Sequence, residues 1–165
     1  MIDLVSHSVD DTCAIASAIA RLARPGDMIV LSGEMGAGKT AFARGFADGL
    51  GVSRDDHVAS PTFNLVHVHE TGRIPLHHAD LHRLGSTAEV ADLGLRESAD
   101  LGAIVLVEWG DMAADVLGDH LTVALEAVDD DEPDARGVTV SVEGHPWDQR
   151  WERLRGALAD WTVGR

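Results

Sequence analysis

The sequence predicts an α/β fold in which helices flank a central sheet, and three segments carry that prediction. Residues 28 to 31 and 103 to 107 are continuous apolar runs bounded by turn residues, which is typical of strands buried on both faces of a sheet. Between them, residues 39 to 50 place apolar side chains at helical spacing, with Gly51 just past the end. With 165 residues and 45% hydrophobic content, residues 1 to 165 fit one domain with a sizeable core.

The remaining elements follow from the same periodicities. Ser8 to Asp11 and Ser86 to Glu89 read as capping-box starts of two further helices. A C-terminal amphipathic helix is expected because Trp147, Trp151, Leu154, Leu158 and Trp161 recur at helical spacing. It could pack on the core of this domain or form a partner surface. Short strands are expected at residues 2 to 5, 64 to 69, 74 to 79, 121 to 127 and 137 to 142, the second and third as an antiparallel hairpin.

Composition and charge exclude several classes of protein. No apolar run approaches the roughly 18 residues needed to span a bilayer, and the N-terminus lacks the features of a signal peptide, so we expect a cytoplasmic protein with no membrane partner. The net charge of −15 repels phosphate backbones, so any role on RNA should be indirect. The acidic segment 129 to 134 is expected to be a solvated turn, and the single cysteine, Cys13, a small buried hydrophobe.

A glycine-rich loop lies between the first apolar run and the helix that follows it. Residues 33 to 40 read Gly-Glu-Met-Gly-Ala-Gly-Lys-Thr, the pattern of a phosphate-binding loop whose backbone amides cradle phosphates at a helix N-terminus. Lys39 should reach the β- and γ-phosphates of ATP, and Thr40 should give its hydroxyl to Mg²⁺. Twelve of the thirteen basic residues are arginine, and the one lysine is Lys39, where the loop needs a compact ammonium. A P-loop that binds ATP or ADP with Mg²⁺ is therefore predicted.

Two acidic residues are candidates for holding the metal or orienting an attacking water. Glu108 ends the most hydrophobic strand, which is the position of a Walker-B acid, and Asp80 follows the weaker strand at residues 74 to 79. Both could serve the same metal, and the sequence leaves open which of them contacts it directly. Trp109, next to Glu108, should lie near the nucleotide, although a role in the core is the alternative.

Two further groups of residues are less specific. The hydroxyls of Ser60 and Thr62, in the segment Ser60 to Phe63, could touch the γ-phosphate or Mg²⁺ as switch residues do, or the segment could be a plain proline-defined loop. Five histidines are dense enough to raise a transition-metal site, but the sequence favours ordinary surface or half-buried roles for them. These histidines are His67, His69, His77, His78 and His82.

Taken together, these motifs resemble the TsaE (YjeE) family, the ATPase component of bacterial tRNA threonylcarbamoyladenosine formation. The resemblance covers roughly residues 8 to 125, and the C-terminal residues carry little of it. Two positions depart from the family pattern, because His82 is usually tyrosine and Glu34 usually aspartate. Four motifs carry the resemblance in the family's order and spacing: Gly33 to Thr40, Ser60 to Phe63, His78 to Leu84 (His-Ala-Asp-Leu-His-Arg-Leu) and Leu106 to Trp109.

The resemblance implies a single P-loop NTPase domain with a mixed central sheet flanked by helices. It also implies Mg²⁺ held near Thr40 and Glu108, Asp80 needed for hydrolysis, and Thr12 close to the nucleotide. The family's partners are the TsaD and TsaB proteins, which modify tRNA, so ATP hydrolysis would drive the cycle of that assembly. The expected catalytic residues are Lys39, Asp80 and Glu108. The expected nucleotide-contacting residues are Thr12, Gly33, Gly36, Ala37, Gly38, Lys39, Thr40, Ala41, Thr62 and Trp109.

Two other functions remain open from the sequence. A small-molecule kinase would share the loop, but it needs a lid bearing several arginines, and the arginines here form no obvious cluster. A nucleotide-binding interaction module would bind without turnover. No arginine is evidently placed to neutralise a γ-phosphate, and Arg83 is the best internal candidate, so we expect slow hydrolysis by the isolated chain and activation by its partners.

Overall fold

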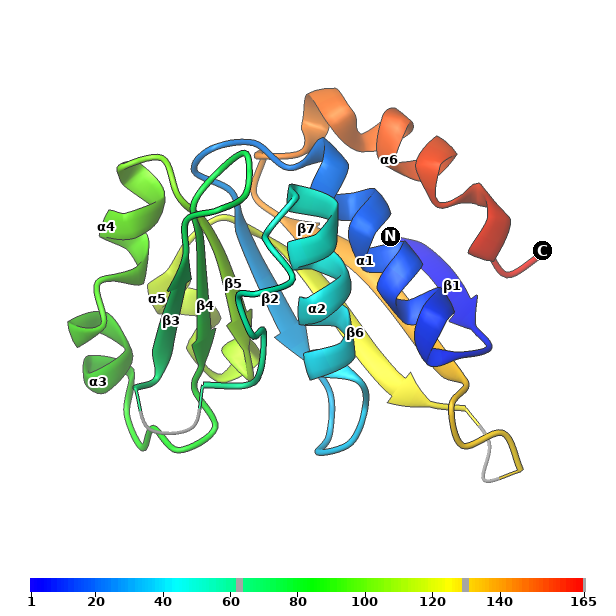
Figure 1. The fold of residues 1–165 in the computed structure, drawn as a ribbon, viewed down its shortest axis with the longest axis horizontal. Helices are drawn as coiled ribbons and strands as arrows, with labels where there is room; N and C mark the ends of the chain where they lie inside the picture. Colours follow the sequence, from blue (N-terminus) through cyan, green and yellow to red (C-terminus); the bar gives the residue numbers. More distant parts are fainter. Residues whose placement is uncertain (62–63, 129–130, 165) are drawn as a thin grey trace.

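A computed structural model describes residues 1 to 61, 64 to 128 and 131 to 164. It contains a seven-stranded sheet with the strand order β1-β7-β6-β2-β5-β4-β3 (Figure 1). The strands are β1 (Ile2–Ser6), β2 (Met28–Ser32), β3 (Val66–His69), β4 (Leu76–Asp80), β5 (Ile104–Glu108), β6 (His120–Ala127) and β7 (Arg136–Glu143).

The sheet is mixed, as the family resemblance implied. The four central strands β6, β2, β5 and β4 run parallel to one another, whereas β1 pairs with β7, β7 with β6, and β3 with β4 in antiparallel register. Because parallel strands end at the same edge, the residues that follow β2, β4 and β5 are brought together there. The expected α/β fold and hairpin are confirmed, although β3 and β4 begin two residues later than predicted.

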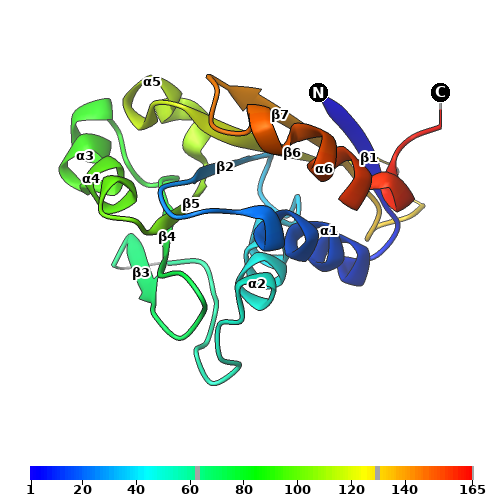
Figure 2. The same cartoon turned by 90° about the horizontal axis from the view of Figure 1, so that it is seen from above.

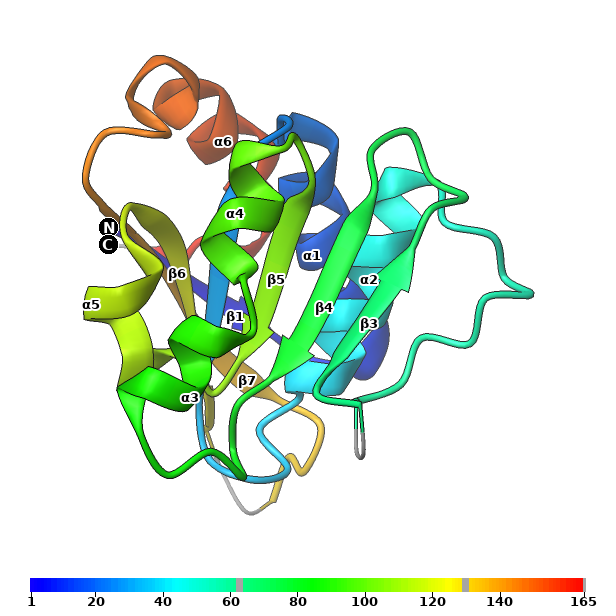
Figure 3. The same ribbon diagram turned by 90° about the vertical axis from the view of Figure 1, so that its left-hand side faces the viewer.

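Helices cover both faces of the sheet (Figure 2). One apolar cluster joins α1, α2 and α6 to one face, and a second joins α3, α4 and α5 to the other (Figure 3). The α-helices are α1 (Val9–Leu22), α2 (Lys39–Leu50), α3 (Thr87–Asp92), α4 (Leu95–Asp100), α5 (Ala114–Leu117) and α6 (Trp151–Ala157). Single 3₁₀ turns are formed by η1 (Gly110–Ala113), η2 (Asp148–Arg150) and η3 (Ala159–Trp161).

Capping explains where the helices begin and end. Ser8 accepts a hydrogen bond from the backbone N–H of Asp11, and Ser86 forms a complete capping box with Glu89, so both predicted helix starts are confirmed. Helix α2 ends at Leu50 and is capped by Gly51, whose φ of 78° is accessible to glycine at little cost. None of the helices in the described residues has both the length and the apolarity to cross a bilayer.

The C-terminal segment packs on the domain's own core. Trp147, Leu154 and Leu158 are fully buried in the cluster that contains α1 and α2. The continuous helix expected from 147 to 161 is wrong in detail, because only Trp151–Ala157 is α-helical and tighter 3₁₀ turns flank it. The acidic turn lies between β6 and β7, and its residues 129 and 130 fall outside the described residues.

Candidate functional site

The glycine-rich loop connects the end of β2 to the start of α2, as predicted. Gly33, Gly36 and Gly38 have φ angles of 140°, 83° and 103°, a region that side chains with a Cβ rarely adopt. A Cβ on Gly33 would also clash with the carbonyl oxygen of Leu125 on β6. Gly38 is the N-cap of α2 and offers no capping side chain, so the first amides of the helix remain suited to an anion.

Lys39 is held inside this loop. Its Nζ donates to the carbonyl oxygens of Gly33 at 2.6 Å and Glu34 at 2.7 Å. The same ammonium lies 4.1 Å from the centroid of the Trp109 ring, within the range of a cation–π contact. The lysine is buried, with 6% of its surface exposed. Its positive charge is therefore concentrated where the loop would receive phosphate.

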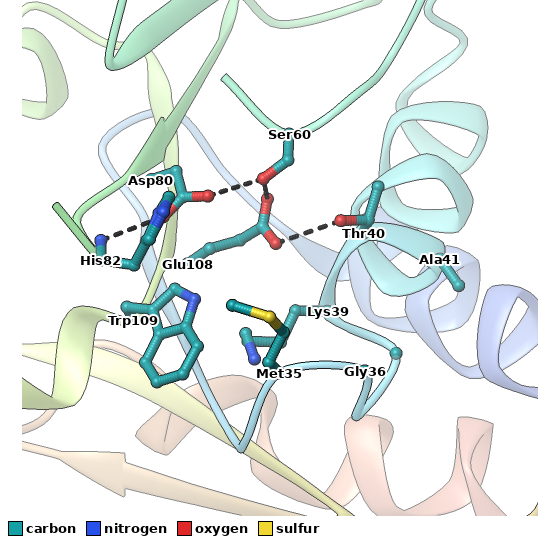
Figure 4. A pocket seen from close by; sticks show the side chains of 11 residues that line it. Met35, Gly36, Lys39, Thr40, Ala41, Ser60, Asp80, His82, Glu108 and Trp109 are labelled. Atoms are coloured by element: carbon teal, nitrogen blue, oxygen red, sulfur yellow. Dashed lines mark hydrogen bonds and ion pairs between the residues drawn. The ribbon is translucent and has the colours of Figure 1, made fainter. Parts of the chain in front are cut away.

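The two candidate acids meet at the carboxyl edge of the sheet. Asp80 ends β4 and Glu108 ends β5, and the two residues are direct partners in the parallel register. Oε1 of Glu108 accepts from the Thr40 hydroxyl at 3.3 Å. The Ser60 hydroxyl lies 2.6 Å from Oδ2 of Asp80 and 3.1 Å from Oε2 of Glu108, so it bridges the carboxylates (Figure 4).

Asp80 is buried, but its hydrogen bonds favour the ionised carboxylate. Burial alone would raise the pKa of its carboxyl group, but hydrogen bonds from Ser60 and from His82 outweigh burial and lower that pKa below its ordinary value. His82 contributes its backbone N–H at 3.1 Å and Nδ1 at 2.8 Å, both to Oδ1. Arg83 donates from Nε to Nε2 of the same imidazole at 3.3 Å. In the described part of the chain, Arg83 is not among the residues that line the cleft.

A cleft of about 330 Å³ collects most of the predicted residues. It opens beside the loop, and the side chains that line it come from the loop itself, the start of α2, the ends of β4 and β5 with the residues just after them, and the segment containing Ser60 (Figure 4). Its lining comprises Met35, Gly36, Gly38, Lys39, Thr40, Ala41, Ser60, Asp80, His82, Glu108 and Trp109.

Trp109 lies at the boundary between the cleft and the core. It lines the cleft, and it also packs against the apolar cluster of α3, α4 and α5. Its φ of 60° is unusual for a residue other than glycine, and strain of this kind often marks a functional site. Contact with a nucleotide stays a prediction.

Some predicted residues lie elsewhere. Gly33 and Ala37 line a second cavity of about 510 Å³ on another side of the loop. Thr12 is buried, and its hydroxyl lies 2.8 Å from that of Ser6; among the described residues it lines neither cavity. The adjacent Cys13 contacts α2, because its Sγ donates to the carbonyl oxygen of Ala41. Thr62 falls outside the described residues.

Two residues of the site were not assigned a role from the sequence. Nε2 of His78 lies 2.6 Å from Oε2 of Glu108. His78 precedes Asp80 by two residues and so shares its face of the strand, and this spacing could have indicated a role for His78 in the site. Arg136, on β7, donates from Nε to the carbonyl oxygen of Ala37 at 2.9 Å and from Nη2 to that of Gly36 at 3.1 Å. No local pattern indicates Arg136, because it lies about 100 positions from the loop in sequence.

The donor set of the cleft fits Mg²⁺ and a phosphate-bearing ligand. Hydroxyl and carboxylate oxygens are hard ligands of the kind that Mg²⁺ prefers, and P-loop sites commonly use few protein ligands because phosphate and water complete the shell. Thr40 and Glu108 would hold the ion, with Asp80 beside them. Within the described ranges, no group of three or more His, Cys, Asp or Glu side chains is placed to hold a metal by itself.

The fold and the site together define a P-loop protein of the α/β class. Residues 6–137 match the model of the family described as threonylcarbamoyl adenosine biosynthesis protein TsaE. The chain is 38% identical over 146 residues to the TsaE protein of Bacillus subtilis, covering 88% of each. It is 41% identical over 134 residues to that of Streptomyces coelicolor, covering 78% of this chain and 88% of the relative.

Comparison with solved structures agrees. The crystal structure of Bacillus subtilis YdiB superposes with a TM-score of 0.77 at 30% identity, covering 94% of this chain and 97% of that chain. The chain belongs to the TsaE family.

Proposed function

We propose that this protein is the ATP-hydrolysing component of tRNA threonylcarbamoyladenosine biosynthesis, and that it drives the cycle of a TsaD–TsaB assembly in the cytoplasm. The observation that supports this most strongly is the convergence of Thr40, Asp80 and Glu108 beside the phosphate-binding loop of a TsaE-family chain. Relatives in two bacteria carry the name of that biosynthetic pathway.

Each residue of the cleft has a distinct task in this proposal. The loop amides and Lys39 bind the β- and γ-phosphates of ATP. Thr40 and Glu108 hold Mg²⁺, which when bound neutralises charge on the phosphates. Asp80, kept ionised by its hydrogen bonds, orients the attacking water. Trp109 lies beside the nucleotide.

The electrostatics of the chain favour partners over direct tRNA binding. A net charge of −15 repels an RNA backbone, so contact with tRNA would pass through the partner proteins. Arg83 donates a hydrogen bond to His82. We therefore favour a transition-state cation that is supplied by a partner protein or is an arginine of this chain reoriented when the assembly forms. Such a cation is worth about 10³- to 10⁵-fold in rate in the GTPases where it acts.

Steady-state phosphate release tests the proposal. Purified TsaD–TsaB complex is titrated into a fixed concentration of wild-type protein or of Lys39→Ala. We expect slow release by the isolated chain, a marked rise with partners, and no release by Lys39→Ala. A flat wild-type response, despite binding shown in the same buffer, would favour the passive module. Phosphoryl transfer to added metabolites would favour the kinase.

A further inference from the structure

The two carboxylate oxygens of Glu108 have different neighbours. Oε1 lies 3.3 Å from the hydroxyl of Thr40, on the side where the loop and α2 meet. Oε2 lies 2.6 Å from Nε2 of His78 and 3.1 Å from the hydroxyl of Ser60. A carboxylate can only accept hydrogen bonds, so the Nε2 of His78 carries a hydrogen and donates it. One oxygen is therefore fixed by protein donors, and the other faces the Thr40 hydroxyl.

His78 is the stronger of the two groups that fix Oε2. The Ser60 hydroxyl carries one hydrogen and lies 0.5 Å nearer to Asp80 (2.6 Å) than to Glu108 (3.1 Å). The imidazole is fully buried on β4, with an exposed fraction of 0%, so water does not compete for its contact with Glu108. A short hydrogen bond to a charged acceptor in such surroundings restrains the rotation of the carboxylate.

Core packing alone does not explain a histidine at this position. Its Nδ1 is buried and has no hydrogen-bond partner among the residues that the structure describes. A buried polar atom left unpaired destabilises the folded state, so an apolar side chain of similar size would pack here without that cost. Leu76 and Leu106, its neighbours on the same face of the sheet, are such side chains.

We propose that His78 is a positioning residue for the metal site, which holds Oε2 of Glu108 and thereby reserves Oε1 for Mg²⁺. This inference rests on the proposed function, because it assigns a task to the cleft only if Mg²⁺ and nucleotide bind there. Groups that orient metal ligands through a hydrogen bond contribute about 10- to 100-fold to metal affinity or activity. His78 acts through Glu108 and does not itself touch the ion.

Calorimetric titration of the full-length protein with ADP, in EDTA and in excess Mg²⁺, measures the gain in affinity that the metal provides. His78→Leu removes the donor, and His78→Asn keeps an amide that is too short to reach Glu108. His78→Gln places an N–H donor near the position of Nε2. The control is His77→Gln, because His77 lies on the opposite face of β4.

In EDTA, we expect His78→Leu and His78→Asn to bind ADP with the affinity of the wild type. The increase in ADP affinity that Mg²⁺ provides should be about 10- to 100-fold smaller in these two variants than in the wild type. His78→Gln should recover most of that increase. In partner-activated hydrolysis, the same variants should lower kcat at limiting Mg²⁺ and recover as Mg²⁺ is raised. His77→Gln should match the wild type in both assays.

The outcomes distinguish failure of the His78 role from failure of the proposed function on which it rests. A wild-type gain retained in both His78→Leu and His78→Asn would overturn the role of His78 while leaving the proposed function intact. The role of His78 would also be overturned if His78→Gln recovered no more of the Mg²⁺-dependent gain in affinity than His78→Asn. If His78→Leu does not fold, the comparison of His78→Gln with His78→Asn tests the role of His78. A wild-type protein that binds ADP equally with and without Mg²⁺ would overturn the proposed function itself.

Discussion

The two carboxylates of the cleft have different hydrogen-bond partners. Asp80 receives three hydrogen bonds, from Ser60 and from two groups of His82, which lower its pKa. Glu108 contacts His78 and Ser60 through Oε2, and its Oε1 faces the Thr40 hydroxyl at the start of α2. We propose on this basis that Glu108 is the direct metal ligand and that Asp80 orients water, an assignment that the sequence left open.

Amide variants test this division at the level of single residues. Glu108→Gln and Asp80→Asn keep side-chain size and remove the charge, so both should slow partner-activated phosphate release by about 10²-fold or more. ADP affinity in EDTA should change little. Raising Mg²⁺ should partly recover Glu108→Gln but not Asp80→Asn. If both variants hydrolyse ATP at the wild-type rate with all partners present, the catalytic acid lies elsewhere.

Sequence reasoning worked best for residues whose place in the fold depends on local order. Gly33 to Thr40, Asp80 and Glu108 each occur at the end of a strand or the start of a helix, and such positions can be read from apolar runs and glycines. No role was predicted for His78 or Arg136, because their partners, Glu108 and the loop carbonyls, come close to them only through strand pairing. Hydrogen bonds between distant segments leave no local periodicity.

At the level of elements, β7 supports the phosphate-binding loop. Arg136 opens that strand and donates to the carbonyl oxygens of Gly36 and Ala37, while its Nη1 donates to those of Pro133 at 2.6 Å and Ala135 at 2.7 Å. The guanidinium thus ties the β6–β7 connection to the loop. It also adds a positive charge within reach of the loop that would bind phosphates.

Removal of this tie should weaken nucleotide binding. Arg136→Met keeps much of the apolar stem and removes the donors, and a loss of one or two hydrogen bonds at about 0.5–1.5 kcal/mol each predicts roughly a 10-fold weaker affinity for ADP. Titration calorimetry measures it, with Arg21→Met, at an exposed position of α1, as the control. Unchanged affinity in Arg136→Met would show that the loop keeps its shape without β7.

The β3–β4 hairpin should make the fold sensitive to mild acid. Burial lowers the pKa of His69, and the charges of His78 and His67 lower it further against the opposing effect of Asp56. A histidine with a depressed pKa in the folded state binds fewer protons than it does in the unfolded chain. Its contribution to stability is therefore complete above the ordinary histidine pKa of about 6.5 and is lost as the pH falls from there towards the lowered value.

Thermal unfolding between pH 7.5 and 5 measures this effect. We expect the Tm of the wild type to fall across that range, and the fall to be smaller in His69→Leu. His57→Leu, which changes an exposed histidine of the loop after α2, should follow the wild-type profile. Parallel profiles for the wild type and His69→Leu would show that His69 does not contribute to the acid sensitivity.

Across the whole molecule, the C-terminal segment is fastened to the end of the sheet opposite the cleft. Arg150 and Asp27 form a buried bidentate pair at 2.6 and 2.9 Å, and Arg150 also donates to the carbonyl oxygens of Leu22 and Pro146. Asp27 precedes β2, whereas the phosphate-binding loop follows that strand. The sequence indicated a helix in this segment, but the ion pair joins residues 123 positions apart and could not be read from it.

This separation predicts that stability and nucleotide binding can be changed independently. Asp27→Asn leaves Arg150 as a buried charge without its counterion, and breaking such a pair costs about 3–5 kcal/mol in the free energy of unfolding. The double variant Asp27→Leu/Arg150→Met removes both charges and should recover much of that loss, because apolar replacement of a buried pair is often neutral. Urea unfolding measures both, and Glu152→Gln, which breaks an exposed pair with Arg155, should cost no more than about 1 kcal/mol.

ADP affinity should stay at the wild-type value in every variant that remains folded, since the pair lies at the amino end of β2 and the cleft at its carboxyl end. A loss of affinity that parallels the loss of stability would show that the C-terminal segment and the nucleotide site form one cooperative unit.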